Sequence, residues 1–189
     1  MVQKNRASPL KVVGFCGLPG SGKSRAIDAI VGLGPVITMG DVIRNEAKKR
    51  NIEPTGENLG KIAKELREKG GQKVVADKCV DLIKAQNSDI IFVDGLRSMA
   101  EVNAFRREWK FPIIAIDLNE EERFKRLLLR GRSDDPKTIE ELKERDKREM
   151  SLGITEVINK ADYVILNDIS VKKLQKKTKK LVNKIIKNY

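Results

Sequence analysis

Residues 17–24 read Gly-Leu-Pro-Gly-Ser-Gly-Lys-Ser and carry the clearest chemical signal of the sequence. They match the pattern G-x-x-x-x-G-K-[ST] in full, and an apolar run at 11–16 directly precedes them. Glycines let the backbone curl closely around an anion, so that several N–H groups point at one phosphate. Lys23 would reach the β- and γ-phosphates of a nucleotide, and the Ser24 hydroxyl would hold Mg²⁺. The predicted triphosphate-binding loop comprises Gly17, Leu18, Pro19, Gly20, Ser21, Gly22, Lys23 and Ser24.

A second oxygen ligand for the metal is expected at the end of another buried strand. Asp94 follows the apolar run 90–93 and so has the position of a Walker B aspartate, which holds Mg²⁺ through a water molecule. The alternative is an aspartate that only caps the next turn. Because the phosphate-binding loop is already present, we favour the metal role, with Lys23 and Asp94 as catalytic residues and Mg²⁺ with ATP as cofactor.

Two further runs follow the second and third apolar segments: Thr-Met-Gly-Asp-Val-Ile-Arg at 38–44 and Asp-Gly-Leu-Arg at 94–97. At these runs the sequence resembles nucleoside monophosphate kinases, and adenylate kinase in particular. The resemblance implies that two arginines grip the phosphate of an acceptor nucleotide. The implied acceptor-binding residues are Thr38, Gly40, Asp41, Arg44, Gly95 and Arg97.

The same resemblance covers a later group of arginines, in Arg-Gly-Arg-Ser-Asp-Asp at 130–135 and Arg-Asp-Lys-Arg at 145–148. It implies a short lid at 130–137, in which Arg130 binds the nucleotide, while Arg132, Arg145 and Arg148 act on the transferring phosphoryl group. Guanidinium groups suit phosphate geometry, and phosphoryl transfer depends on positioning and positive charge. The alternative is a solvated helical surface on which neighbouring glutamates pair with these arginines.

A stretch at 161–168 resembles the last strand of dephospho-coenzyme A kinases, where the following turn borders the adenine. It makes Asn167, Asp168 and Ile169 adenine-side candidates, although an ordinary turn between strand and helix is the simpler interpretation. From residue 11 to about 174, the sequence is most similar to a small archaeal family described as adenylate-kinase-related. That similarity implies binding of ATP and of an AMP-like ligand.

Short apolar segments alternate with amphipathic helical segments, which predicts a parallel sheet with helices on both faces. Strands are expected at 11–16, 36–39, 90–93, 112–118 and 163–166. Helices are expected at 23–31, 41–50, 58–69, 72–86, 100–109, 120–129, 136–152 and from 170 onward. Asn119 is the expected N-cap of one helix, and Asp135, before Pro136, that of the next. The prediction is a single α/β P-loop NTPase domain over 1–189, with a five-stranded sheet, a helical acceptor-binding insertion at 57–88 and a basic helix at 170–189.

Composition excludes several functions. Histidine is absent, and the only cysteines are Cys16 and Cys79, so histidine catalysis and a zinc ribbon are ruled out. No apolar run reaches the roughly 18 residues of a membrane span, so a cytoplasmic protein without a membrane partner is expected. Eight lysines at 171–189 contribute most of the net charge of +12, and aromatic residues make up only 4% of the chain. Nucleic acid binding is therefore not the favoured function.

The pattern as a whole predicts a kinase that moves the γ-phosphoryl group of ATP to a nucleotide-like acceptor, such as AMP. A hydroxyl acceptor, as in dephospho-coenzyme A, would need a carboxylate base, for which Asp41 is the candidate. Two alternatives from other classes are an RNA- or ribosome-associated ATPase and a nucleotide sensor without turnover.

Overall fold

Five parallel strands form the centre of the structure, a computed structural model that describes residues 9–131 and 135–189. The strands are β1 (Lys11–Cys16), β2 (Val36–Thr38), β3 (Ile90–Asp94), β4 (Ile113–Asp117) and β5 (Tyr163–Leu166). Their order in the sheet is β2-β3-β1-β4-β5, and every pairing is parallel. The α/β fold and the five-stranded sheet expected from the alternating pattern are therefore confirmed.

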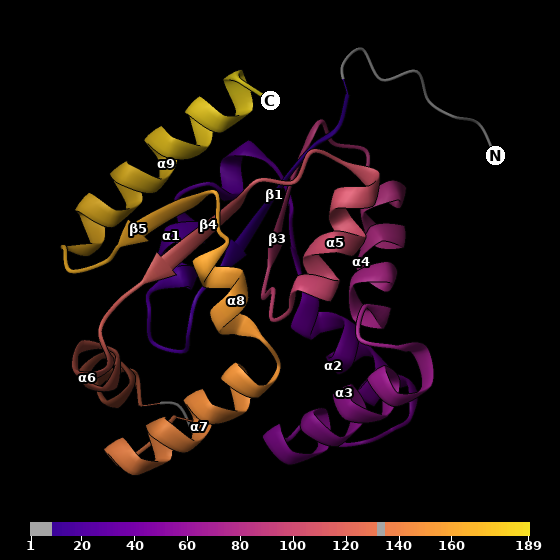
Figure 1. Cartoon of the computed structure of the whole chain (residues 1–189), viewed down its shortest axis with the longest axis vertical. Helices are drawn as coiled ribbons and strands as arrows, with labels where there is room; N and C mark the ends of the chain where they lie inside the picture. Colours follow the sequence, from indigo (N-terminus) through magenta and orange to yellow (C-terminus); the bar gives the residue numbers. More distant parts are fainter. Residues whose placement is uncertain (1–8, 132–134) are drawn as a thin grey trace.

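Helices cover both faces of this sheet, while α6 and α7 lie beyond the carboxyl ends of the strands (Figure 1). The helices are α1 (Lys23–Asp28), α2 (Met39–Lys49), α3 (Gly56–Gly70), α4 (Val74–Ala85), α5 (Met99–Glu108), α6 (Glu120–Arg130), α7 (Ile139–Ser151), α8 (Ile154–Asn159) and α9 (Val171–Lys187), together with a 3₁₀ turn at Val31–Leu33. No helix in the described ranges is both long and apolar enough to cross a membrane.

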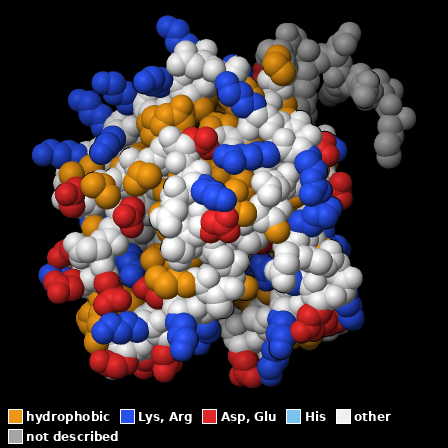
Figure 2. Space-filling model, viewed as in Figure 1, with side chains coloured by type: hydrophobic (Ala, Val, Ile, Leu, Met, Phe, Trp, Pro, Cys, Tyr) orange, Lys and Arg blue, Asp and Glu red, His pale blue; other side chains and the backbone are white. Residues whose placement is uncertain are grey.

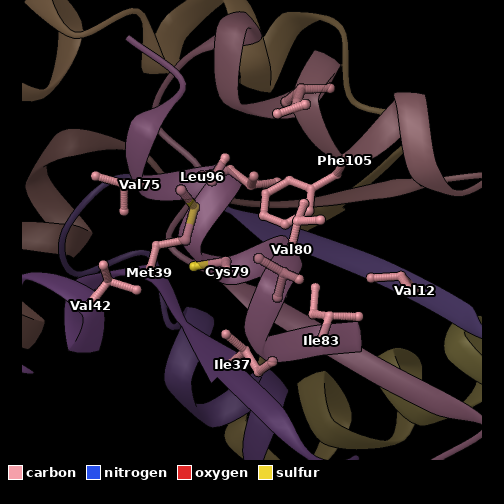
Figure 3. Close-up of a cluster of buried hydrophobic side chains, with 14 of the residues drawn as sticks. Val12, Ile37, Met39, Val42, Val75, Cys79, Val80, Ile83, Leu96 and Phe105 are labelled. Carbon is pink, nitrogen blue, oxygen red and sulfur yellow. The ribbon is translucent and has the colours of Figure 1, made fainter. Parts of the chain in front are cut away.

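Successive side chains of β1 point to opposite faces of the sheet and belong to two separate hydrophobic clusters. Val12 and Cys16 belong to a cluster with α2, α4 and α5, whereas Val13 and Phe15 belong to a cluster with α1 and α9. Figure 3 shows how Cys79 of α4 lies within the first cluster, among aliphatic side chains. Burial raises the pKa of Cys16 and of Cys79 to about 12, so both thiols remain protonated and act as apolar filling.

Several predicted boundaries shift in the structure. The helix expected at 23–31 ends at Asp28 and continues as the 3₁₀ turn, because Gly32 and Gly34 disfavour further helix. Asn119 is confirmed as an N-cap, since its side chain accepts a hydrogen bond from the Glu122 amide at 2.9 Å. The segment that ends at residue 152 is followed by α8, a helix that the sequence analysis did not predict.

Asp135 was wrongly predicted as the cap of the helix after it. That helix begins at Ile139, and Thr138 caps it by accepting from the Glu141 amide at 3.2 Å. Asp135 instead accepts hydrogen bonds from the guanidinium of Arg130. A charged donor offers a carboxylate a stronger hydrogen bond than a neutral backbone amide does, which explains why Asp135 is drawn away from the helix.

Candidate functional site

The glycine-rich loop follows β1 and turns tightly before α1. Gly17, Gly20 and Gly22 have φ angles of 153°, 82° and 94°, which residues other than glycine rarely adopt. The amide of Ser21 donates to the carbonyl of Leu18 at 3.1 Å, which closes the turn. The loop therefore has the curled backbone that phosphate binding requires.

Lys23, which begins α1 directly after this loop, contacts Asp94 at the end of β3. The Lys23 Nζ forms an ion pair with the Asp94 carboxylate, and only 19% and 16% of the two side chains are exposed. Asp94 ends β3, where its Cα is paired in register with Phe15 of β1 and with Thr38 of β2. Three strand ends thus bring the predicted lysine, the predicted Walker B aspartate and the first acceptor residue to one edge of the sheet.

The residues near this pair fit a magnesium ion that arrives with its nucleotide. Ser24 follows Lys23 and is exposed, and Asp94 supplies a carboxylate. Among residues 9–131 and 135–189, no group of three His, Cys, Asp or Glu side chains could hold a metal alone. Mg²⁺ commonly uses one or two protein oxygens together with substrate phosphates and water, which matches this donor set.

Side chains distant in the sequence fix the back of the loop. The Asn167 Nδ2 donates to the carbonyl of Ser21 at 2.6 Å, and Arg126 donates to the carbonyl of Asn167 at 2.7 Å. Arg123 donates to the carbonyl of Pro19 at 3.0 Å. Helix α6 and the turn after β5 thereby hold the loop backbone in place.

Arg123 also makes a paired contact with helix α7. Its two terminal nitrogens donate to the two carboxylate oxygens of Asp146 at 3.0 and 2.5 Å, and both side chains are almost fully buried. No sequence motif singles out Arg123 as a functional residue. A signal was present, because Arg123 precedes Leu127 by four positions and therefore shares the buried face of α6.

The three residues predicted to border the adenine lie in different environments. Asn167 is buried against the phosphate loop, Asp168 is exposed, and Ile169 packs on the cluster beneath α9. Asn167 therefore contacts the loop backbone itself, a role that the sequence analysis did not assign to it.

Replacing Gly22 by alanine should weaken both folding and nucleotide binding. A Cβ at this position would lie 2.1 Å from the Asn167 Nδ2, and the φ angle of 94° adds strain. Backbone strain of this kind costs about 1–3 kcal/mol, and the clash would push Asn167 off the loop. Urea unfolding and ATP titration measure the two effects. Gly60→Ala in helix α3 is the matched control, because nothing lies within 4 Å of its Cβ; an equal loss in that variant would contradict the prediction.

On the acceptor side, Arg44 is held by a residue of its own helix. Its Nε donates to the Asp41 Oδ1 at 2.8 Å, and about half of each side chain is exposed. The guanidinium lies over Gly40, 3.4 Å from the position of a Cβ there. A groove of about 610 Å³ opens beside this arginine. Its lining residues are Arg44, Asn45, Lys48, Asn51, Ile52, Glu53 and Pro54.

Arg97 lies in a loop that a buried glutamate organises. The carboxylate of Glu101 accepts from the Arg97 amide at 2.8 Å and from the Arg67 guanidinium of α3 at 3.1 Å. Gly95 begins this loop with a φ angle of 96°. The Arg97 side chain forms an ion pair with Glu149 of α7 at 3.2 Å. The carboxylate partners of Arg44 and Arg97 thus lie on different helices, α2 and α7.

Two of the four arginines predicted to act at the lid lie around one carboxylate. Arg130 donates from Nε to the Asp135 Oδ2 at 2.8 Å, and Arg145 lies 3.7 Å from the Oδ1 of the same residue. Arg148 is exposed on α7, and Arg132 lies outside the described residues. Asp135 thus brings two of the predicted phosphate-binding arginines together, one at the end of α6 and one in α7.

These contacts share an electrostatic pattern. A carboxylate partners each of five predicted phosphate-binding cations, namely Lys23, Arg44, Arg97, Arg130 and Arg145. An anionic ligand must therefore compete with a carboxylate for each of these cations. Such pairs keep long side chains ordered near the site and limit the repulsion among them.

Fold and loop together define a P-loop protein, in which the loop follows the central strand β1 of a five-stranded parallel sheet. The sequence pattern of an AAA domain matches residues 16–143. Among the solved structures with a similar fold is the Thermus thermophilus protein TT1252, with a TM-score of 0.64 at 17% identity over 94% of this chain and 98% of its own. Another is shikimate kinase from Bacteroides thetaiotaomicron, with a TM-score of 0.61 at 14% identity over 92% of this chain and 98% of its own.

The chain belongs to the UPF0200 family. It is 44% identical to a UPF0200 protein of Pyrococcus horikoshii over 94% of this chain and 99% of that protein. A UPF0200 protein of Hyperthermus butylicus is 39% identical, with 92% and 94% covered. A UPF0200/UPF0201 protein of Archaeoglobus fulgidus is 44% identical over 95% of this chain, which spans 57% of that longer relative.

Proposed function

We propose that this chain is a kinase that transfers the γ-phosphoryl group of Mg²⁺–ATP to a nucleotide-like acceptor, and that the acceptor is a nucleoside monophosphate such as AMP. The observation that supports this most is the convergence of Lys23, Asp94 and Thr38 at one edge of the sheet. The segments that carry Arg44 and Arg97 begin at this same edge, because they follow β2 and β3.

The pairing of Lys23 with Asp94 suggests how this site works. When a triphosphate binds in the loop, Lys23 exchanges the carboxylate for the β- and γ-phosphates. Asp94, through a water molecule, and the Ser24 hydroxyl would then hold Mg²⁺, which would supply positive charge to the phosphates. An acceptor oxygen attacks the γ-phosphorus while the bond to the bridging oxygen of ADP breaks. In this proposal the lid residues Arg130, Arg132, Arg145 and Arg148 neutralise the charge that moves between the two nucleotides.

The contact between Asp41 and Arg44 favours a monophosphate over a hydroxyl acceptor. A phosphate oxyanion is already a nucleophile, whereas a hydroxyl needs a base within hydrogen-bond reach. Asp41 is the candidate base, but its Oδ1 already accepts from the Arg44 guanidinium at 2.8 Å. In this arrangement Asp41 orients the arginine, so a supporting role suits it better than proton abstraction.

An ADP-release assay tests the proposal. The acceptor panel is AMP, CMP, UMP and dTMP, with dephospho-coenzyme A and shikimate as hydroxyl acceptors and a reaction without acceptor as control. We expect ADP release to depend on a nucleoside monophosphate. Equal release without any acceptor would instead indicate an ATPase, and release with hydroxyl acceptors alone would overturn the choice of acceptor.

Substituting Glu149 by glutamine should tighten acceptor binding. The change removes the charge that holds Arg97 at 3.2 Å and leaves the guanidinium available to an acceptor phosphate. Since Glu149 would not touch ATP, we expect the acceptor KM to fall about twofold to fivefold, as for the loss of a competing ion pair of up to about 1 kcal/mol, with kcat little changed. Steady-state kinetics with varied acceptor measures this. Glu144→Gln, at an exposed position of the same helix, is the control; a similar drop in KM for that variant would rule out a specific effect at Arg97.

A further inference from the structure

Helix α9 carries an uncompensated positive charge. Its sequence contains eight lysines and no acidic residue, and all eight lysines are exposed. None of them forms an ion pair or a side-chain hydrogen bond anywhere in residues 9–131 and 135–189. On other helices, four lysines have acidic partners: Lys61, Lys69, Lys125 and Lys160 each pair with a glutamate three or four positions away.

The lysines share one face of this helix. Leu174, Thr178, Val182 and Ile185 point into the core beneath α9, and the lysines occupy the opposite half of the helical circumference. In Figure 2, Lys and Arg side chains project along the edge of the molecule where Figure 1 places α9. At 1.5 Å per residue, the lysine face is about 22 Å long. Its members are Lys172, Lys173, Lys176, Lys177, Lys179, Lys180, Lys184 and Lys187.

This face is also rigidly mounted. Lys11 donates to the carbonyl of Ile186 at 3.0 Å, and Lys110 donates to that of Asn188 at 3.2 Å. The Tyr189 hydroxyl accepts from the Val12 amide at 2.9 Å, which ties the end of the chain to β1. These contacts hold the carboxyl end of α9, and the apolar face of the helix packs against α1 and β5, so the lysines project as a ridge from a helix that the rest of the fold keeps in place.

We propose that the lysine face of α9 binds double-stranded nucleic acid through its phosphate backbone, without reading the base sequence. Like charges one helical turn apart destabilise a helix, and a polyanion relieves that cost. A duplex presents phosphates in a regular, rigid array that suits a rigid row of cations. The face offers no aromatic side chain for stacking, so binding to unpaired bases is not expected.

Two other anionic partners fit less well. A helix that binds a membrane surface inserts an apolar face among the lipids, but the apolar face of α9 is buried in the core. An acidic protein would need buried apolar or aromatic anchors, and the lysine face has none. Phosphate contacts alone are what this surface can provide.

Fluorescence anisotropy with the full chain and labelled 20-base-pair duplexes of DNA and of RNA tests the proposal. Because about four to six phosphates can face such a ridge, we expect log K to fall with log[salt] at a slope of about −4 to −5. DNA and RNA duplexes should bind within a few-fold of each other, and single strands and phosphatidylserine vesicles should bind at least tenfold more weakly. Vesicles that bind as tightly as the duplexes would overturn the choice of partner, as would a preference for single strands.

Lysine-to-glutamine variants locate the binding surface. Changing Lys172, Lys176, Lys180 and Lys184 together should lower duplex affinity at least tenfold and reduce the salt slope by about 3. The charge-matched control changes Lys61, Lys69, Lys125 and Lys160, which already have acidic partners, and should leave the slope near the wild-type value. Because the α9 variant loses like-charge repulsion, its Tm should not fall, which separates lost binding from lost folding. Equal binding losses in the two variants would refute the assignment to α9.

Discussion

Replacing Lys23 by alanine is expected to reduce the rate of acceptor-dependent ADP release by at least about 10²–10³-fold, the usual effect of removing one group that stabilises developing charge. Within residues 9–131 and 135–189, Lys23 is the cation that forms an ion pair with Asp94. Its loss removes the positive charge and also leaves the Asp94 carboxylate facing the incoming triphosphate. Both effects disfavour ATP, so its affinity should fall along with the rate.

Asp94→Asn provides the complementary control for this experiment. It removes the carboxylate that competes for Lys23, so ATP should still bind, whereas Mg²⁺-dependent turnover should be lost. Thermal unfolding of both variants shows whether the fold survives. A Lys23→Ala protein that is folded and keeps wild-type turnover would place the active site elsewhere in the molecule.

Much of this site could be predicted from local sequence. The loop at 17–22 is one continuous segment, and its glycines indicate the positive φ angles that the structure contains. The parallel sheet is also predictable from local sequence, because strands that are buried on both faces appear as unbroken runs of apolar residues. The contact between Asp94 and Lys23 is not evident from local sequence alone. It also depends on the pairing of β3 with β1, which brings the two residues together.

The remaining features depend on contacts between distant segments. Asn167 contacts Ser21 although the two lie 146 positions apart in the sequence. Neither residue type predicts such a contact. Asp135 was assigned to a cap because local rules do not include the arginines that surround it in space. Helix α8 is only six residues long and begins after Gly153, so it gives too little periodicity to detect.

The buried contact between Arg123 and Asp146 is where such a distant interaction should matter most for folding. Arg123→Met leaves the Asp146 carboxylate without its two hydrogen bonds in a position that is almost fully buried. Breaking one side of a buried ion pair costs about 3–5 kcal/mol, and we expect a loss of that size in the free energy of unfolding, measured by urea denaturation. The variant also removes the donor to the carbonyl of Pro19, so ATP affinity should fall as well.

A second substitution separates the stability of the pair from its effect on the loop. Arg123→Met combined with Asp146→Leu removes both charges of this buried pair, and most of the lost stability should return because apolar replacements of buried ion pairs are often neutral or better. ATP affinity should stay low, because neither new side chain can donate to the carbonyl of Pro19. If the double variant regained ATP affinity together with stability, Arg123 would act on the phosphate loop only by keeping the protein folded, and the hydrogen bond from α6 would have no separate role in positioning it.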